Sequence, residues 1–295
     1  MLPIKTKTSF SGFIIKGEKV GRTINFPTAN LKLAKTLDFL KPGVYVARVR
    51  LNKKAYLGLA YYGPRYIFGE KVNNFEVYIF NFNQNIYGQK LQANLTHFIR
   101  SPKKVKNLKA LQSLLENDLH QLDNYVTLIN RKDQPLGIEK KSLAHLKNGK
   151  LHRAISIQLF NSNGELLIQQ RSKHKMLFPL IWANTVCTDV RPYETYLQAA
   201  HRRLLEEFGL TSKLKLHHHF LYQAKYKKVG SEKELDHFFI GLTNQTPKPN
   251  PQEITDYKFI SLKHLKKDIK NYPKKYAPWF KLILKKLQRS DILTS

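Results

Sequence analysis

The 295-residue sequence contains a single cysteine, Cys187, and only 21 acidic residues beside 51 lysines and arginines. One cysteine excludes an internal disulfide framework, and a free thiol is typical of a reducing compartment. No apolar run reaches the roughly 18–20 residues that a membrane-spanning helix needs, and the first residues lack the apolar core of a secretory signal. We therefore expect a cytoplasmic protein without a membrane span.

The excess of basic residues gives a formal net charge of +30, and this charge is spread along the chain. Residues 1–125 carry 20 basic and 7 acidic residues, a net of +13, whereas residues 126–295 carry 31 and 14, a net of +17. A nucleic-acid-binding protein more often concentrates its charge on one face or tail. An even excess also fits a lysine-rich proteome or sites for phosphorylated small molecules, and composition alone leaves these options open.

The length predicts two domains, at roughly 150 residues per domain, and the pattern along the chain divides them into residues 1–123 and 124–295. Short β-rich runs between residues 10 and 100 are separated by turn signals, which predicts a small all-β antiparallel barrel or sandwich. Leucines at helical spacing over 105–122 predict an amphipathic helix that closes this domain. The expected strands are 10–15, 43–51, 55–63, 75–82 and 91–99.

The second domain mixes strands and helices, as α+β proteins do. A strand is expected at 125–130, and a hairpin around Asn163-Gly164 is expected within 155–171. A helix over 194–210 should end at Gly209, because glycine is favoured at helix C-termini. Two further strands are expected at 217–226 and 234–243, and a terminal helix at 276–288.

The segment GEKVGRTINFPTANL, residues 17–31, is the most informative part of the first domain. Gly17 and Gly21 permit close approach of the backbone, which is useful for wrapping phosphates. Thr28 and Asn30 offer the hard oxygen ligands that suit Mg²⁺ shared with nucleotide phosphates. Glycine spacing alone is weak evidence, and an ordinary Gly/Pro/Asn turn is the simpler interpretation of this segment taken by itself.

A longer series of motifs follows in order: Pro-Thr-Ala-Asn at 27–30, Glu76, Tyr87-Gly88 and Arg100. Together with the closing helix, this series resembles the riboflavin kinase domain over about residues 8–122. The resemblance implies a six-stranded antiparallel barrel that transfers the γ-phosphate of ATP to the 5′-hydroxyl of riboflavin. Because the adenylyltransferase domain that precedes this kinase in many bacteria is absent from the sequence, FMN rather than FAD is the expected product.

The resemblance to riboflavin kinase also implies roles for individual residues. Thr28 and Asn30 bind Mg²⁺-ATP beside Gly17 and Gly21, and Glu76 is the general base. A primary alcohol is a poor nucleophile, and a carboxylate can accept its proton while the phosphoryl group moves. The residues alone leave open a solvated strand carboxylate at Glu76. The segment GPRYIFGE, residues 63–70, departs from the usual Pro-Thr-Phe turn of the family.

Candidate metal ligands occur in the second domain. His145 and His152 lie seven residues apart, and Glu232 and Glu234 lie two apart on an expected strand, so that both carboxylates point to one face. Two imidazoles and a carboxylate pair suit Mn²⁺, Mg²⁺ or Zn²⁺, and Tyr222 is expected near the same face. Since the chain has 11 histidines, exposed surface histidines are the alternative interpretation.

Residues 188–210 carry a degraded form of the motif with which Nudix hydrolases bind Mg²⁺. Thr188 replaces a glycine, and Arg203 replaces the first glutamate of the metal-binding helix. A hydrolase that needs the full set of carboxylates would be weakened by Arg203. The positions that keep the pattern are Glu194, Arg202, Leu204, Glu206, Glu207, Gly209 and Leu210.

Several ordered blocks surround this motif, among them Trp182-x-Asn-x-x-Cys, RRLLEEFGL at 202–210, ExELDHFF at 232–239 and APWF at 277–280. With these blocks, residues 125–288 look like type 1 isopentenyl-diphosphate isomerase, a Nudix-fold enzyme in which arginine also replaces the motif glutamate. The resemblance implies metal-dependent isomerisation of isopentenyl diphosphate to dimethylallyl diphosphate. This chemistry needs an acid and a base on opposite faces of a dry pocket.

The resemblance to the isomerase assigns the acid and base roles to Cys187 and Glu234, with Tyr222 assisting. Trp279 shields the carbocation with its π face, and Glu207 helps to hold a Mg²⁺ ion that bridges the diphosphate. The implied metal ligands are His145, His152, Glu232 and Glu234. The residues that match diphosphate contacts are Lys141, Arg171 and Lys175.

Two positions depart from the isomerase family. The family places a third metal-binding histidine two residues after the cysteine, where this chain has Asp189. Aspartate can ligate Mn²⁺ or Mg²⁺ and shifts the preference towards harder ions, so we expect metal binding with Asp189 as a ligand. The glycine that precedes the tryptophan segment in the family is Leu180 here.

The sequence therefore predicts a bifunctional enzyme with riboflavin, ATP and isopentenyl diphosphate as small-molecule substrates. Asp189 motivates the alternative of a kinase joined to a Nudix hydrolase or to an inactive isomerase-like domain. A non-enzymatic alternative rests on the segment 263–289, which holds ten basic residues and one acidic residue. A solvated lysine face on a terminal helix explains that segment more simply, so no specific nucleic-acid partner is expected. The oligomeric state is left open.

Overall fold

The computed structural model describes residues 2–33, 37 and 39–287. The chain forms two compact units, Met1–Ile138 with Arg191–Tyr193, and Glu139–Val190 with Glu194–Ser295. The predicted division between residues 123 and 124 stays a prediction. None of the helices in the described ranges is long and apolar enough to cross a membrane. Residue 288 of the expected terminal helix and residues 288–289 of the basic segment lie outside the described residues.

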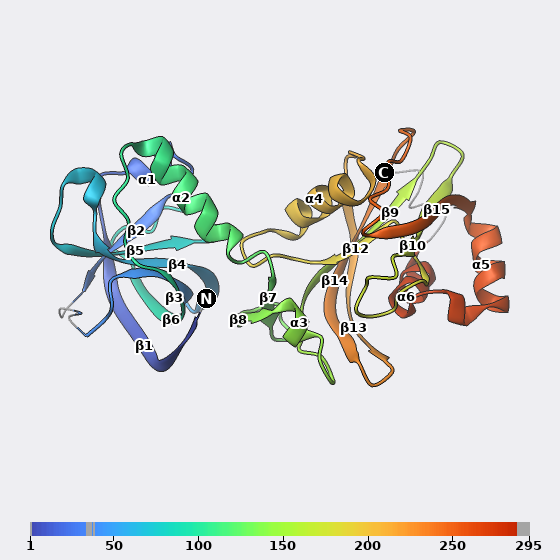
Figure 1. Cartoon of the computed structure of the whole chain (residues 1–295), viewed down its shortest axis with the longest axis horizontal. Coiled ribbons are helices and arrows are strands. Elements are labelled where there is room, and N and C mark those ends of the chain that lie inside the picture. The colour runs from blue at the N-terminus through green and yellow to red at the C-terminus, as the bar shows by residue number, and fades with distance from the viewer. Residues whose placement is uncertain (1, 34–36, 38, 288–295) are drawn as a thin grey trace. The chain divides into compact units, whose positions relative to one another are not determined.

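The first unit contains a closed barrel of antiparallel strands in the order β1-β2-β5-β4-β3-β6 (Figure 1). This confirms the all-β barrel and its implied six strands. Along β5, Phe75, Val77 and Ile79 point into the core of the barrel, so that Glu76 between them faces outwards. The strands are β1 (Leu2–Ile15), β2 (Thr28–Leu33), β3 (Gly43–Leu51), β4 (Lys54–Pro64), β5 (Asn73–Ile79) and β6 (Lys90–Arg100).

Strand β2 was not expected from the sequence, because its polar residues suggested a loop. The segment 17–31 instead contains the short helix α1 (Val20–Thr23) and then enters β2. Ala29 and Leu31 fill the barrel core, and the alternation of a strand places Thr28 and Asn30 on its outer side. The 3₁₀ helix η1 (Tyr66–Phe68) lies within the segment 63–70.

The helix α2 (Leu108–His120) lies within the predicted range 105–122 and crosses the outside of the barrel (Figure 1). It begins after Asn107, whose side chain accepts a hydrogen bond from the Ala110 amide. Leu119 and Leu122 pack with outward-facing barrel residues, so the helix covers an apolar part of the outer face. Two short strands follow, β7 (Tyr125–Ile129) and β8 (Pro135–Lys140).

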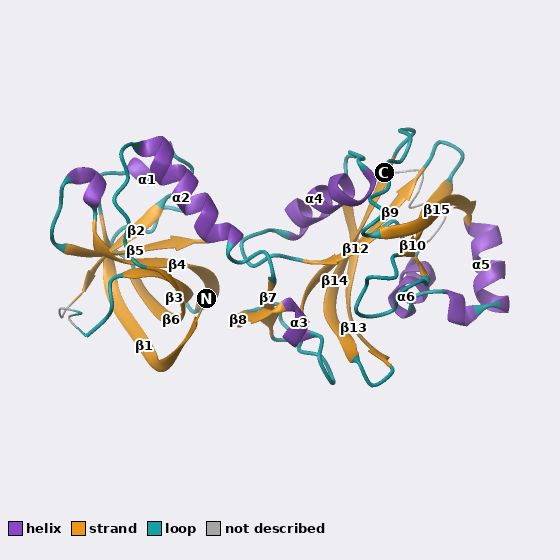
Figure 2. Ribbon diagram, viewed as in Figure 1, coloured by secondary structure: helices purple, strands orange, loops and turns teal. Residues whose placement is uncertain are grey.

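The second unit is built on a mixed sheet in the order β11-β10-β9-β14-β13, with β12 beside β9 and β15 beside β10. β9 and β14 run parallel. The helices α4 (Tyr196–Phe208) and α6 (Pro278–Lys286) pack on opposite faces of this sheet (Figure 2). The strands are β9 (His152–Phe160), β10 (Glu165–Arg171), β11 (Trp182–Ala183), β12 (Val186–Asp189), β13 (Lys215–Tyr226), β14 (Gly230–Leu242) and β15 (Ile254–Ser261).

The two helices that the sequence predicts in the second unit, α4 and α6, lie within their expected ranges of 194–210 and 276–288. Thr195 and Gln198 form a reciprocal cap at the start of α4, and Gly209 ends it with φ 64°. α5 was not expected; it begins after Ser261, whose side chain accepts a hydrogen bond from the His264 amide. The helical elements are α3 (Lys141–Ala144), α4 (Tyr196–Phe208), α5 (Leu262–Asn271), η2 (Pro273–Lys275) and α6 (Pro278–Lys286).

Candidate active sites

The outer face of the barrel brings together the residues that the sequence singled out in the first unit. Asn30 of β2 and Tyr61 of β4 are the cross-strand partners of Glu76, and Thr28 is the partner of Tyr78. Directly paired residues of antiparallel strands share a face. The Thr28 hydroxyl donates a hydrogen bond to Glu76 Oε2 over 2.8 Å.

A pocket lies between this outer face and α2. Gly17 and Gly21 line it together with Thr28, Asn30 and Glu76. A Cβ atom at Gly17 would overlap the Asn30 side chain, and one at Gly21 would overlap the Phe26 carbonyl, so both positions need glycine for steric reasons. Tyr87 and Arg100 also line the pocket, and Leu111, Leu114 and Leu115 of α2 form its apolar wall.

Glu76 is held in a largely buried position, with 16% of its side chain exposed. Burial raises the pKa of its carboxyl group, while the Thr28 hydrogen bond and the Arg65 charge oppose that rise. Arg65 Nε lies 3.8 Å from Glu76 Oε1 and donates to Glu70 Oε2 over 2.9 Å. Arg65 carries no motif that could be recognised in the sequence, although it lies in the segment that departs from the family pattern.

Arg100 has a structural contact that the motif did not reveal. Its guanidinium donates two hydrogen bonds of 2.7 Å to the two carboxylate oxygens of Asp118 on α2. Burial raises the pKa of Asp118, and the Arg100 hydrogen bonds and charge oppose that rise. This bidentate pair fastens α2 against the end of β6, beside the pocket.

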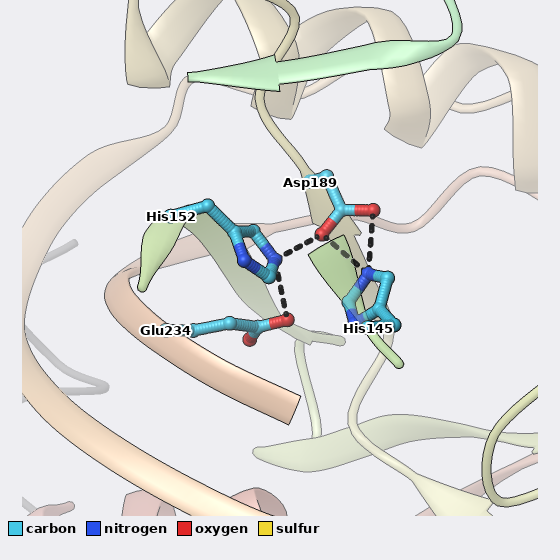
Figure 3. Close-up of side chains that lie close together, drawn as sticks. All are labelled: His145, His152, Asp189 and Glu234. Atoms are coloured by element: carbon cyan, nitrogen blue, oxygen red, sulfur yellow. Dashed lines mark hydrogen bonds and ion pairs between the residues drawn. The ribbon is translucent and has the colours of Figure 1, made fainter. Parts of the chain in front are cut away.

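In the second unit, His145, His152, Asp189 and Glu234 point towards one another (Figure 3). His152 and Glu234 are partners on the parallel strands β9 and β14, and Asp189 lies on β12, at the other edge of β9. All four residues are buried, and one ligand atom of each lies within 4.8 Å of the others. The alternative of exposed surface histidines is therefore wrong for His145 and His152.

The hydrogen bonds of His152 orient one ring nitrogen towards the carboxylates. Its Nδ1 lies 2.7 Å from the Lys150 carbonyl, which can only accept, so Nδ1 carries the hydrogen. Nε2 then faces Asp189 Oδ1 at 2.9 Å and Glu234 Oε1 at 3.5 Å. A donated hydrogen bond from the far nitrogen is the usual arrangement of a metal-binding histidine.

His145 completes the group from the other side. Its Nε2 lies 3.4 Å from Asp189, and its Nδ1 lies 2.9 Å from Glu232 Oε2. Burial lowers the pKa of His145, but Asp189 and Glu232 outweigh it and raise the pKa to about 11. Burial also lowers the pKa of His152, but Asp189 and Glu234 outweigh it and raise the pKa to about 10. A site that attracts two protons so strongly also suits a divalent cation in their place.

The carboxylate of Asp189 is surrounded by the basic side chains of this group. Lys141 Nζ lies 2.7 Å from Asp189 Oδ2, although the Lys141 side chain is half exposed. Burial alone raises the pKa of Asp189, but Lys141 and His145 hold it well below its usual range. Asp189 is therefore ionised and in position to act as an oxygen ligand.

Cys187 lies on β12, packed against the apolar cluster that contains Trp279. Arg171 Nη1 donates a hydrogen bond to its sulfur over 3.2 Å. Burial raises the pKa of Cys187 to about 12 despite the Arg171 charge, so the sulfur is protonated at neutral pH. Tyr222 donates a hydrogen bond to Glu234, and its ring centroid lies 6.2 Å from that of Trp279.

Glu207 and Lys175 lie in a separate network of ion pairs. One Glu207 oxygen pairs with Arg203 and the other accepts a hydrogen bond from Gln169 over 2.9 Å, so the structure does not bring Glu207 into the donor group of Figure 3. Glu253, which the sequence analysis missed, pairs with both Arg203 and Lys175. Burial raises the pKa of Glu253, but the charges of Lys175 and Arg203 outweigh burial and lower the pKa to about 2.

Asp236 is a further residue that the sequence analysis missed, although it continues the alternation of Glu232 and Glu234 along β14. It is buried and accepts a hydrogen bond from Ser156 Oγ over 2.8 Å. Ser156 is the β-sheet partner of Cys187, which places Asp236 next to the same face of the sheet. Burial and then the Glu234 charge raise the pKa of Asp236 to about 8.

Comparison with known proteins supports the family resemblance of each half of the chain. Residues 4–126 match the family model of riboflavin kinase, and residues 150–280 match the model of the NUDIX domain. The isopentenyl-diphosphate Delta-isomerase of Pectobacterium atrosepticum is 38% identical over 157 residues, which cover 53% of this chain and 87% of that protein. The Aromatoleum aromaticum isopentenyl-diphosphate Delta-isomerase 1 is 39% identical over 158 residues, 54% of this chain and 89% of that protein. The chain therefore belongs, through its C-terminal half, to the isopentenyl-diphosphate Delta-isomerase family and carries a riboflavin kinase domain ahead of it.

Proposed function

We propose that the chain is a bifunctional enzyme. Residues 1–123 phosphorylate riboflavin to FMN with ATP, and residues 124–295 isomerise isopentenyl diphosphate to dimethylallyl diphosphate. Family membership supports both halves. The observation that carries the proposal is that each half gathers groups suited to its reaction: a buried carboxylate beside Thr28 in one, and a thiol and carboxylates beside two histidines in the other.

In the kinase half, Glu76 accepts the proton of the riboflavin 5′-hydroxyl while that oxygen attacks the γ-phosphate of ATP. A carboxyl group whose pKa is raised by burial is a better proton acceptor than an ordinary one. Thr28 donates its hydrogen to Glu76, which leaves its oxygen lone pairs available to Mg²⁺ bound with ATP. Asn30 offers a second oxygen, and Gly17 and Gly21 keep the backbone close to the phosphates.

In the isomerase half, Cys187 is the acid and Glu234 is the base. β12 and β14, which carry them, flank β9 on its two sides. The raised pKa of Cys187 keeps its proton available for the double bond, and burial raises the pKa of Glu234 so that it accepts a proton readily. Tyr222 orients Glu234 through their hydrogen bond, and Trp279 offers its ring face to the carbocation.

His145, His152, Asp189 and Glu234 would hold a divalent cation, with Glu232 against the far nitrogen of His145. Glu232 lies outside this donor group, and the two carboxylates that remain with the two histidines suit Mg²⁺ or Mn²⁺. When bound, the cation supplies positive charge that offsets the clustered carboxylates. The proposed diphosphate contacts are Lys141, Arg171 and Lys175. For Glu207 to hold the bridging Mg²⁺, its contacts with Arg203 and Gln169 must open.

Product analysis separates this proposal from its alternatives. The purified full chain is incubated with isopentenyl diphosphate, or with nucleoside diphosphate derivatives, in the presence of Mg²⁺ or Mn²⁺. Dimethylallyl diphosphate is the expected product, and a chelator should abolish it. Hydrolysis of the nucleoside substrates without isomerisation would identify a Nudix hydrolase instead. Absence of both products, with FMN still formed from riboflavin and ATP, would identify an inactive isomerase-like domain.

A further inference from the structure

Arg171, the last residue of β10, is a buried guanidinium with 7% of its surface exposed. Its Nε donates to the Phe178 carbonyl and its Nη2 to the Leu177 carbonyl, each over 3.0 Å. The carbon at the centre of the guanidinium lies 5.3 Å from the centroid of the Trp279 ring. Contacts on two edges and one face hold the planar group in one orientation.

The remaining nitrogen of this fixed group, Nη1, points at the reactive atom of Cys187. It donates a hydrogen bond to the sulfur over 3.2 Å. A guanidinium that served only to bind diphosphate would gain nothing from this contact. The hydrogen bonds to the backbone of 177–178 hold the guanidinium so that Nη1 faces the sulfur.

We propose that Arg171 is a positioning residue for Cys187: it fixes the sulfur in place and balances the negative charge left there when the proton is transferred. The inference rests on the proposed isomerase function. It adds a role for Arg171 to the diphosphate contact that the family resemblance implies. The role is an electrostatic one, since a hydrogen-bond donor aimed at a developing charge lowers the barrier of the step that creates it.

Each turnover moves two protons. The S–H bond of Cys187 breaks and its electron pair stays on sulfur, while the π electrons of the substrate form a new C–H bond and leave a tertiary carbocation. Glu234 then takes a proton from the opposite carbon, and the electrons of that C–H bond form the new double bond. The enzyme is left with a thiolate beside Arg171 and a protonated Glu234, and exchange of protons with water restores both groups.

The test uses the full chain with Arg171→Gln and Arg171→Lys. Arg153→Gln, which removes a charge from the residue after His152 on the opposite face of β9, is the matched control. Three quantities are measured: kcat for isopentenyl diphosphate, its KM, and the rate at which iodoacetamide alkylates Cys187 at one fixed pH. Because Cys187 is the single cysteine of the chain, the mass shift reports on that thiol alone.

Arg171→Gln should lower kcat by about 100-fold, as loss of one donor to a developing charge does, and the lost diphosphate contact should raise KM as well. Alkylation of Cys187 should slow by about tenfold, one pKa unit of thiolate stabilisation. Arg171→Lys should recover part of kcat and part of the alkylation rate. If the glutamine variant fails to fold, the lysine variant is measured in its place. A raised KM with kcat and alkylation unchanged would overturn the inference in favour of a diphosphate contact alone. If the wild-type chain makes no dimethylallyl diphosphate, the proposed function fails, while the alkylation rates still test the Arg171 contact.

Discussion

Replacement of Glu76 by glutamine tests the chemistry of the kinase half with little disturbance of its structure. Glutamine keeps the volume of the side chain and can still accept the 2.8 Å hydrogen bond from Thr28. The change removes the attraction to Arg65 across 3.8 Å, worth about 4 kcal/mol at an effective dielectric constant of about 20. It also removes the cost of burying a charge, and Arg65 keeps its hydrogen bonds to Glu70. We therefore expect the free energy of unfolding to change by about 1 kcal/mol or less.

The catalytic effect of Glu76→Gln should be far larger than its effect on stability. Loss of a general base lowers kcat by about 10²–10⁴-fold, measured as FMN formed from riboflavin and ATP. In the wild type, burial raises the pKa of Glu76, so the acid limb of the kcat profile should lie above the ordinary carboxyl pKa of about 4.3. Glu70→Gln is the matched control, because it removes a carboxylate bound to the same Arg65. A Glu76→Gln variant with more than about a tenth of wild-type kcat would refute the role of general base.

Three further predictions concern stability, measured by chemical or thermal unfolding of the full chain. Leu180 has φ 60° where the family has glycine, so Leu180→Gly should stabilise the protein by up to about 1 kcal/mol; destabilisation would show that the leucine side chain outweighs the strain. Asp118→Ala leaves Arg100 without its buried partner and should cost about 3 kcal/mol, and a cost under about 1 kcal/mol would contradict that account. The pKa of Asp236 is raised to about 8 in the folded state, so its contribution to stability is present at acid pH and lost as the pH rises towards 8. Asp236→Asn should flatten the fall in Tm between pH 5 and pH 9, and an unchanged slope would show that Asp236 does not titrate there.

The barrel could be predicted because its strands obey simple alternation. Five of its strands stand out as β-rich runs between turn signals, but β2 does not, since Thr28 and Asn30 on its outer side are the residues that resemble a loop. The helix α5 was missed for a related reason. Its lysines suggested a solvated segment, whereas Leu262, Leu265 and Ile269 form the apolar stripe that packs against the unit.

The candidate sites could be predicted as sets of residues but not as contacts. The spacing of Glu232 and Glu234 gives their shared face, and the resemblance gives His145 and His152. The pairs that connect distant segments carry no local signal: Arg171 lies 16 residues from Cys187, and Asp118 lies 18 residues from Arg100. The position of Glu207 depends on its ion pair with Arg203. The motif suggests that the Glu207 carboxylate binds a metal ion, but in the structure it binds the arginine.

The central claim is that two separate sites in one chain perform two reactions, and crossed variants test it most directly. Riboflavin with ATP, and isopentenyl diphosphate with Mg²⁺ or Mn²⁺, are given to the wild type, Glu76→Gln and Cys187→Ala, and the products are quantified. The account predicts FMN and dimethylallyl diphosphate from the wild type, dimethylallyl diphosphate without appreciable FMN from Glu76→Gln, and FMN without dimethylallyl diphosphate from Cys187→Ala. Isomerisation that survives in Cys187→Ala, or a wild type that yields one product alone, would contradict it.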